Sequence, residues 1–188
     1  MKPALFNSKR KLKCATQRVS NIDSKAGYKI FAINSCKMIK GLFETHINVA
    51  SLERSMKFYG DVLGLHLGAY DERRRVAFYW LGDWGEAMIG VWEKPAGQVF
   101  PQHYAFRCGV DDVLNHSVSY LKQRGLGFYN FLHDGSERPM VFGWMPAIAI
   151  YFDDPDGHSL EFIAMLPGKP QPEIGIVPYD EWKALQPG

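Results

Sequence analysis

The sequence lacks the segments that would place the protein in or across a membrane. None of its apolar runs approaches the ~20 residues that a transmembrane helix needs, and no apolar stretch near Met1 resembles a secretory signal. The three cysteines are an odd number, and Cys14 and Cys36 lie in a polar stretch, so they do not make a disulfide framework. We therefore expect a reducing, cytoplasmic location and no membrane partner.

The chain after residue 37 also lacks an excess of basic residues. Residues 1–37 hold nine Lys or Arg and one acid, which gives them a charge of +8, and because the whole chain carries +2 the remainder carries −6. An acidic body offers no basic patch, so we expect no nucleic-acid partner. Because residues 1–37 also lack apolar periodicity, we predict a basic leader, disordered or non-native, with a targeting peptide as an alternative. A single domain over 38–166 and a Pro/Gly-rich tail over 167–188 follow.

The residues after Met38 repeat one pattern of short strands and a helix. A strand over 42–49, a helix over 51–59 and strands near 65–70, 75–81 and 86–92 make the first round. The second round has a strand over 103–109, a helix over 112–124 and strands near 127–132, 147–153 and 158–165. An internal repeat decides the fold more firmly than any single motif. The pattern predicts an α+β domain of two tandem modules, at about 40–95 and 100–165.

Three potential metal ligands lie in predicted strands of this repeat. His46 and His103 are in the opening strands of the two modules, and Glu161 is in the last strand. Two imidazoles and one carboxylate are a known ligand set for a divalent metal with open coordination positions. Either histidine alone would more simply be a core or surface residue. The two histidines, however, occupy equivalent places in the repeat. A glutamate that faces the interior of a sheet is costly unless it is paired or bound to a metal. Together these two points favour a metal site.

Four motifs resemble the vicinal oxygen chelate superfamily, which includes glyoxalase I, extradiol dioxygenases, fosfomycin-resistance enzymes and bleomycin-binding proteins. They are Thr-His-Ile-Asn-Val at 45–49, Phe-Tyr-Gly-Asp-Val-Leu-Gly-Leu at 58–65, His-Tyr-Ala-Phe at 103–106 and Tyr-Phe-Asp-Asp-Pro-Asp-Gly-His-Ser-Leu-Glu at 151–161. The resemblance implies two βαβββ modules that form a curled mixed sheet around a metal held by His46, His103 and Glu161. It also implies a homodimer.

The chain departs from glyoxalase I at one ligand position. Glyoxalase I supplies a fourth ligand, a Glu, from the last strand of the first module, and the matching residue here is Gly90, or Ile89 with one residue of slip. Glu86 and Glu93 would need a register shift to replace it. We therefore expect weak or absent lactoylglutathione lyase activity. The fosfomycin enzymes use only two His and one Glu, and their tyrosine beside the metal matches Tyr151.

The resemblance implies a metal-dependent enzyme in which one divalent ion (Mn, Fe, Zn, Ni or Co) acts as a Lewis acid on a small oxygenated substrate. We expect Tyr151 and Glu44 to be catalytic, and Asn48, Arg107 and Trp144 to bind the substrate. A fosfomycin-type thiol transferase or hydrolase and an extradiol dioxygenase are the alternative reactions. A metal-free drug-binding protein, like those that confer bleomycin resistance, is the alternative from another functional class.

Overall fold

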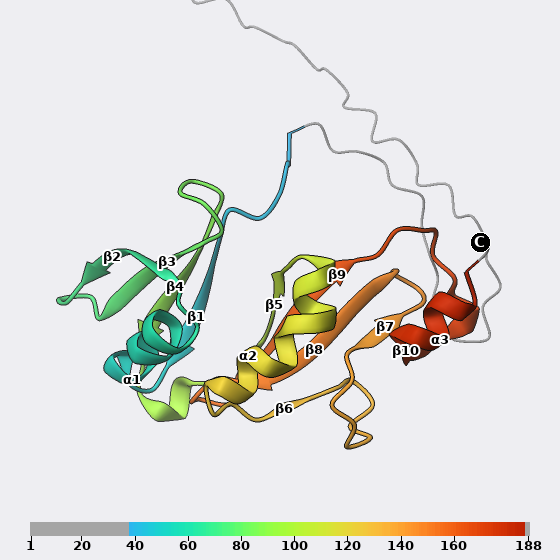
Figure 1. The fold of residues 1–188 in the computed structure, drawn as a ribbon. Helices are drawn as coiled ribbons and strands as arrows, with labels where there is room; N and C mark the ends of the chain where they lie inside the picture. The colour runs from blue at the N-terminus through green and yellow to red at the C-terminus, as the bar shows by residue number, and fades with distance from the viewer. Residues whose placement is uncertain (1–37, 187–188) are drawn as a thin grey trace, which may run out of the picture.

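A computed structural model describes residues 38–186, so the predicted leader over 1–37 lies outside the described residues. The described chain forms two sheets, each with helical segments against one face (Figure 1). This confirms the α+β class and the two modules, although the two sheets are separate and do not close on each other. No helix among residues 38–186 combines the length and apolarity that a membrane span requires.

The first module is a four-stranded sheet with strand order β1-β4-β3-β2. Its strands are β1 (Glu44–Val49), β2 (His66–Asp71), β3 (Val76–Leu81) and β4 (Ala87–Glu93). The helix α1 (Leu52–Met56) continues as a π-helical segment, η1 (Lys57–Val62), and crosses from β1 to β2. The Ser51 hydroxyl caps α1 by accepting from the Arg54 N–H at 3.4 Å. β1 and β4 run parallel, which places His46 directly beside Gly90.

The second module repeats this plan with one extra short strand. It consists of β5 (His103–Arg107), η3 (Asp112–His116), α2 (Ser117–Gln123), β6 (Phe128–Tyr129), β7 (Met140–Phe142), β8 (Ala147–Asp153) and β9 (Ser159–Met165). β5 and β9 are parallel, as β1 and β4 are, while β8 pairs antiparallel with β9, β7 and β6. A short 3-10 turn, η2 (Ala96–Gln98), lies between the modules.

The C-terminal stretch, predicted as a Pro/Gly-rich tail, contains a strand and a helix. After the turn η4 (Pro172–Ile174), the strand β10 (Ile176–Pro178) pairs antiparallel with β7 and extends the second sheet. The helix α3 (Tyr179–Ala184) then buries Trp182, 3% exposed, in a cluster that includes Val141 and Leu166. The Pro and Gly residues of this stretch concealed both elements in the sequence.

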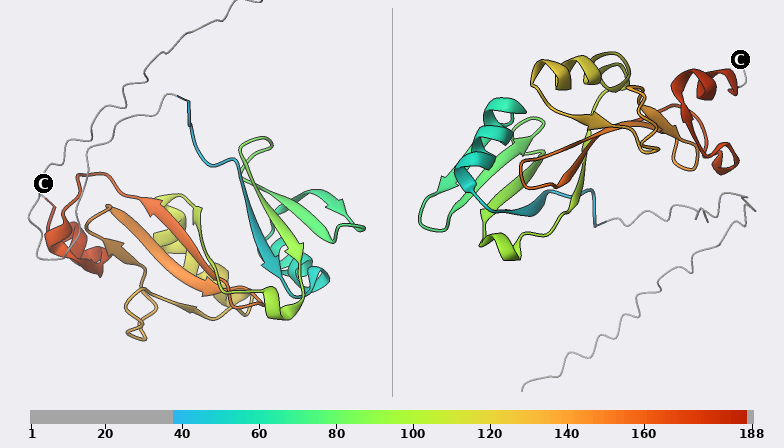
Figure 2. Two further views of the ribbon diagram at one scale, coloured as in Figure 1. Left: turned by 180° about the vertical axis from the view of Figure 1, so that it is seen from behind. Right: turned by 90° about the horizontal axis from the view of Figure 1, so that it is seen from below.

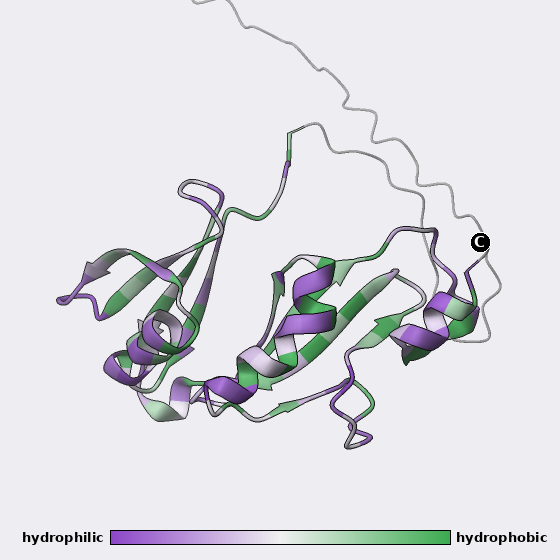
Figure 3. Ribbon diagram, in the orientation of Figure 1, coloured by the Kyte–Doolittle hydropathy of each residue, from purple (hydrophilic) through white to green (hydrophobic). Residues whose placement is uncertain are grey.

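One hydrophobic core joins the two modules. Ile47 and Tyr59 of the first module pack in the same buried cluster as Leu121, Ile150 and Phe152 of the second. In Figure 3 the apolar colour follows β7 and β8, whereas α1 and α2 carry hydrophilic stretches on the outside. Figure 2 shows α1 and α2 on the same side of the two sheets, so the opposite sheet faces carry neither helix.

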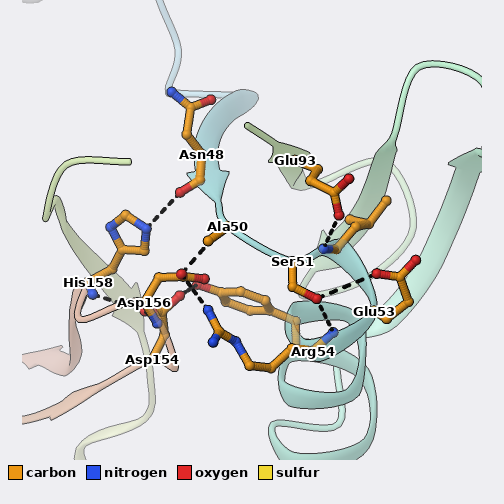
Figure 4. A network of polar contacts seen from close by, with 11 residues as sticks. Asn48, Ala50, Ser51, Glu53, Arg54, Glu93, Asp154, Asp156 and His158 are labelled. Atoms are coloured by element: carbon orange, nitrogen blue, oxygen red, sulfur yellow. Dashed lines mark hydrogen bonds and ion pairs between the residues drawn. The ribbon is translucent and has the colours of Figure 1, made fainter. Parts of the chain in front are cut away.

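The turn between β8 and β9 fastens the modules together (Figure 4). Asp154 accepts a 3.0 Å hydrogen bond from the Tyr59 hydroxyl, and Asp156 pairs with Arg54 at 2.5 Å. Burial raises the pKa of Tyr59 well above its usual range, and the neighbouring Asp154 charge adds to this. Gly157 has φ +80, a conformation that glycine adopts without steric cost. The Asp-Pro-Asp-Gly motif therefore has a structural role here.

His158 belongs to the same junction. The imidazole is fully buried, its Nδ1 accepts from the Gln102 N–H at 3.1 Å, and its Nε2 lies 2.8 Å from the Asn48 carbonyl oxygen. Because Nδ1 accepts, Nε2 must carry the proton that it donates to Asn48. The His158 imidazole therefore has a structural role at the junction of the two modules.

Candidate metal centre

The first half of the candidate site lies on the face of the first sheet that α1 does not cover. Alternation along β1 buries Ile47 and Val49 in the core and leaves Glu44 and His46 on the opposite face. His46 Nε2 and Glu44 Oε1 are 2.5 Å apart, and about half of the His46 side chain is exposed. We call Glu44, His46 and Gly90 the first half-site.

Gly90 is the β4 residue that faces His46. A Cβ atom at Gly90 would lie 2.7 Å from His46 Cδ2 and 3.0 Å from Phe78 Cε1, closer than side chains tolerate. Ile89 is fully buried on the other face of the sheet, so the register resolves the two positions that the sequence left open. Glu93 cannot act as a substitute, because it pairs with Arg75 and accepts from the Leu52 N–H. The position of the fourth glyoxalase ligand is therefore occupied by the edge of the His46 ring.

Aromatic rings surround His46, which the sequence did not indicate. The ring centroids of Trp92 and Phe78 lie 5.5 and 6.1 Å from that of His46. The cationic groups of Arg74 and Lys94 lie 5.4 and 5.5 Å from the centroid of Trp92. The register of β3 and β4 could have predicted Trp92 and Phe78, since both share the face of Gly90.

The second half-site consists of His103, Tyr151 and Glu161 in the second sheet. His103 Nε2 lies 2.9 Å from Glu161 Oε2, and His103 Nδ1 lies 3.2 Å from the Ser159 carbonyl oxygen. A carbonyl only accepts, so Nδ1 donates and Nε2 is the nitrogen left to bind a proton or a metal. This backbone contact is the kind that orients a metal-bound imidazole.

The Glu161 carboxyl is 5% exposed, and burial raises its pKa. A divalent cation would offset the cost of burying the charged form of this carboxyl. Carboxylate and neutral imidazole are both metal ligands. The donor set of the second half-site therefore fits a metal ion.

Tyr151 is paired directly with Glu161 across β8 and β9. Burial, the Glu161 charge and a hydrogen bond with Glu161 raise the pKa of Tyr151 well above its usual range, so the phenol stays protonated. The Tyr151 and Tyr129 rings are stacked with centroids 5.7 Å apart, and His133 stacks on Tyr129 at 4.7 Å. The sequence missed this ladder of rings because Tyr129 and His133 belong to a short strand and the loop after it.

Of the remaining predicted site residues, Asn48 and Trp144 lie near the two half-sites and Arg107 does not. Asn48 is on β1 two residues after His46, and Trp144 packs beside Phe142 and Tyr151. Arg107 is four residues after His103 on β5, which separates the two residues by about 13 Å at ~3.3 Å per residue. Its side chain lines a separate cavity of about 570 Å³. Within residues 38–186 of a single chain, no three His, Cys, Asp or Glu side chains come together in a group that could hold a metal ion.

Comparisons with known proteins identify relatives of the whole two-module unit. The model of the Glyoxalase/Bleomycin resistance protein/Dioxygenase superfamily matches residues 41–162. An integron cassette protein from the mobile metagenome of the Halifax Harbour sewage outfall is 33% identical, with a TM-score of 0.60, and the match covers 68% of this chain and 100% of that chain. No curated protein matches.

Two further solved structures share the fold at lower identity. The oxidase ChaP-H2 is 23% identical with a TM-score of 0.53, and the match covers 71% of this chain and 100% of that one. Lactoylglutathione lyase from Agrobacterium tumefaciens is 15% identical with a TM-score of 0.50, and the match covers 67% of this chain and 94% of that one. These two likenesses establish the fold alone.

Proposed function

The chain belongs to the Glyoxalase/Bleomycin resistance protein/Dioxygenase superfamily, and on this premise we propose that it is a metal-dependent enzyme for a small oxygenated substrate. His46, His103 and Glu161 hold the ion, which is Mn, Fe, Zn, Ni or Co. The observation that carries the proposal is the 2.9 Å His103–Glu161 pair, with the imidazole oriented by the Ser159 carbonyl. When bound, the metal supplies Lewis acidity to neighbouring oxygens of the substrate.

We propose that the two half-sites meet across a homodimer. Both lie on helix-free sheet faces, and His46 and His103 each expose about half of the side chain. A two-fold axis would bring the first half-site of one copy against the second half-site of its partner. By symmetry the same interface then contains two identical centres. This arrangement accounts for a trio that does not assemble within one described chain.

The protein side chains then orient the substrate. Tyr151 remains protonated, so its hydroxyl can donate to a substrate oxygen that gains negative charge. Asn48 and Trp144 flank the first and second half-sites and supply a polar and an aromatic contact. Glu44, 2.5 Å from His46, is the carboxylate that we propose for catalysis.

Gly90 limits the reaction that this centre performs. Lactoylglutathione isomerisation needs a base within about 2.6–3.2 Å of the substrate proton, and β4 presents no carboxylate on the face of His46. We therefore propose weak or absent lactoylglutathione lyase activity. The ring ladder of Tyr151, Tyr129 and His133 favours a second candidate, an extradiol-type oxygenase for an aromatic substrate with adjacent oxygens.

Metal analysis after anaerobic reconstitution tests the proposal. The wild-type protein should bind one divalent ion per chain, and His103→Ala and Glu161→Gln should abolish tight binding. His116→Ala is the matched control, because His116 is an exposed histidine paired with Asp111 on the helical side. A wild-type protein that binds no metal but binds planar drugs would establish the metal-free binding function instead. Hemithioacetals, catechols and fosfomycin are the substrates to screen on the loaded protein.

A further inference from the structure

Two cationic side chains lie beside the first half-site, around the ring of Trp92. The guanidinium carbon of Arg74 and the ammonium nitrogen of Lys94 lie 5.4 and 5.5 Å from the Trp92 centroid. That centroid is in turn 5.5 Å from the centroid of His46. One small molecule bound at the metal can therefore extend along Trp92 and reach both cations.

Strand alternation explains why these cations share the face of the first half-site. Glu93, the last residue of β4, turns toward α1 and pairs there with Arg75. Trp92 and Lys94, on either side of Glu93, therefore project from the opposite face of the sheet. The β2–β3 turn divides in the same way, because Arg75 contacts Glu93 whereas the preceding Arg74 contacts Trp92.

The charges around Trp92 leave one positive charge without a partner. Arg74 Nε pairs with Asp71 Oδ2 at 2.8 Å, and the Arg74 backbone N–H donates to Asp71 Oδ1 at 3.0 Å. No carboxylate within residues 38–186 pairs with the half-buried Lys94. Arg74, Lys94 and Asp71 together carry +1, which is the charge that one carboxylate group balances.

Two hydrogen-bond donors at the same place also lack an acceptor. Trp92 Nε1 is shielded from solvent and has no hydrogen-bond partner in the described part of the chain, and native proteins leave few buried polar groups unpaired. Asn48 lies directly beside Trp92 in the register of β1 and β4, and its amide points away from the His158 junction (Figure 4). A carboxylate offers two acceptor oxygens to donors of this kind.

We propose that the side chains around Trp92 form a subsite for a carboxylate of the substrate, made of Asn48, Arg74 and Lys94. The substrate is then a planar compound with adjacent oxygens at the metal and a carboxylate at its far end. This inference rests on the proposed function, because the metal holds the oxygen end. The Trp92 ring packs against the planar part, and charge-assisted hydrogen bonds hold the carboxylate.

A pair of ligands that differ only in the carboxylate tests this subsite. The probe 3,4-dihydroxyphenylacetate has two adjacent oxygens and a carboxylate, and its methyl ester keeps the oxygens but loses the charge. We would load wild-type, Lys94→Ala and Lys57→Ala proteins with Zn²⁺, which has no redox chemistry, and measure both affinities by isothermal titration. Lys57 is an exposed lysine of η1, so its variant is the matched control.

Zinc content, dimer mass and circular dichroism are recorded for every variant, and Lys94→Gln replaces Lys94→Ala if the alanine variant does not fold. Wild type should bind the acid at least ~10-fold more tightly than the ester, the scale of one hydrogen bond to a charged group. Lys94→Ala should lose most of this preference with unchanged affinity for the ester, and Lys57→Ala should keep it.

A preference for the acid that Lys94→Ala retains would overturn the inference, as would an equal loss of affinity for acid and ester. A zinc-loaded wild type that binds neither compound would overturn it and leave the metal centre standing. Loss of the dimer in Lys94→Ala would overturn it too, because Lys94 would then bind a carboxylate of the second copy. A wild-type protein that binds no divalent ion would refute the proposed function, and the inference with it.

Discussion

Replacing Gly90 by alanine tests whether the His46 ring lies where a metal ligand should. The new Cβ would be 2.7 Å from His46 Cδ2, whereas ordinary contacts begin at 3.4 Å, so the ring must move by about 0.7 Å. Crowding of this kind costs about 1–3 kcal/mol in a packed core. Here we expect about 1 kcal/mol, because the half-exposed His46 side chain can rotate away. Metal affinity should suffer more, since ligand sites tolerate displacements of only ~0.5 Å.

We therefore expect Gly90→Ala to lower metal affinity at least ~10-fold, the scale on which disturbed ligand orientation acts, with a small change in melting temperature. Gly97→Ala is the matched control, because a Cβ there meets nothing within 4 Å and the change tests backbone entropy alone. Isothermal titration and thermal melts of both variants give the comparison. If Gly90→Ala binds metal as tightly as Gly97→Ala, the placement of His46 over Gly90 as a ligand is wrong.

Three further predictions concern groups outside the metal centre. Burial raises the pKa of Cys108 to about 11, so little thiolate is present at pH 8. In a variant whose other two cysteines are replaced by serine, a thiol reagent at pH 8 should label Cys108 only slowly until denaturant is added. Arg75 lowers the pKa of Glu93 to about 2, from 4.5, so Glu93→Gln should be less stable than wild type above pH 4.5, with the difference shrinking as pH falls through about 2. His158→Ala should cost on the order of 2–4 kcal/mol in denaturant unfolding, because it removes two hydrogen bonds and leaves a cavity; a loss below that of a surface histidine variant would contradict the junction role.

Alternation and repetition made much of the fold predictable. The strand predicted over 42–49 is β1 (Glu44–Val49), and its alternating burial places Ile47 in the core and leaves His46 on the opposite face. The Asp-Pro-Asp-Gly-His motif marked the β8–β9 turn, although its contacts to Tyr59 and Arg54 depend on residues about a hundred positions away. The three-residue strands β7 and β10 escaped notice because three residues are too few to show a period.

The candidate site was predictable by residue type but not by arrangement. The sequence singled out His46, His103 and Glu161, yet it gave no sign that Glu44 would lie against the His46 ring. That contact depends on the side-chain conformations of residues two apart on one strand and on the missing side chain at Gly90. Whether two half-sites meet within a chain or between chains depends on how the modules are placed, which no local pattern records.

A complementation measurement tests most directly the claim that the metal centre is shared between two copies. We would co-express His46→Ala and His103→Ala chains with different tags and isolate the mixed dimer by two affinity steps. Each variant alone should bind no metal tightly, because both centres of its homodimer lack a ligand. In the mixed dimer one centre combines the intact first half-site of the His103→Ala chain with the intact second half-site of the His46→Ala chain, so metal analysis should find one ion per dimer. A mixed dimer without metal, beside a wild-type dimer that binds it, would contradict a centre built from two chains.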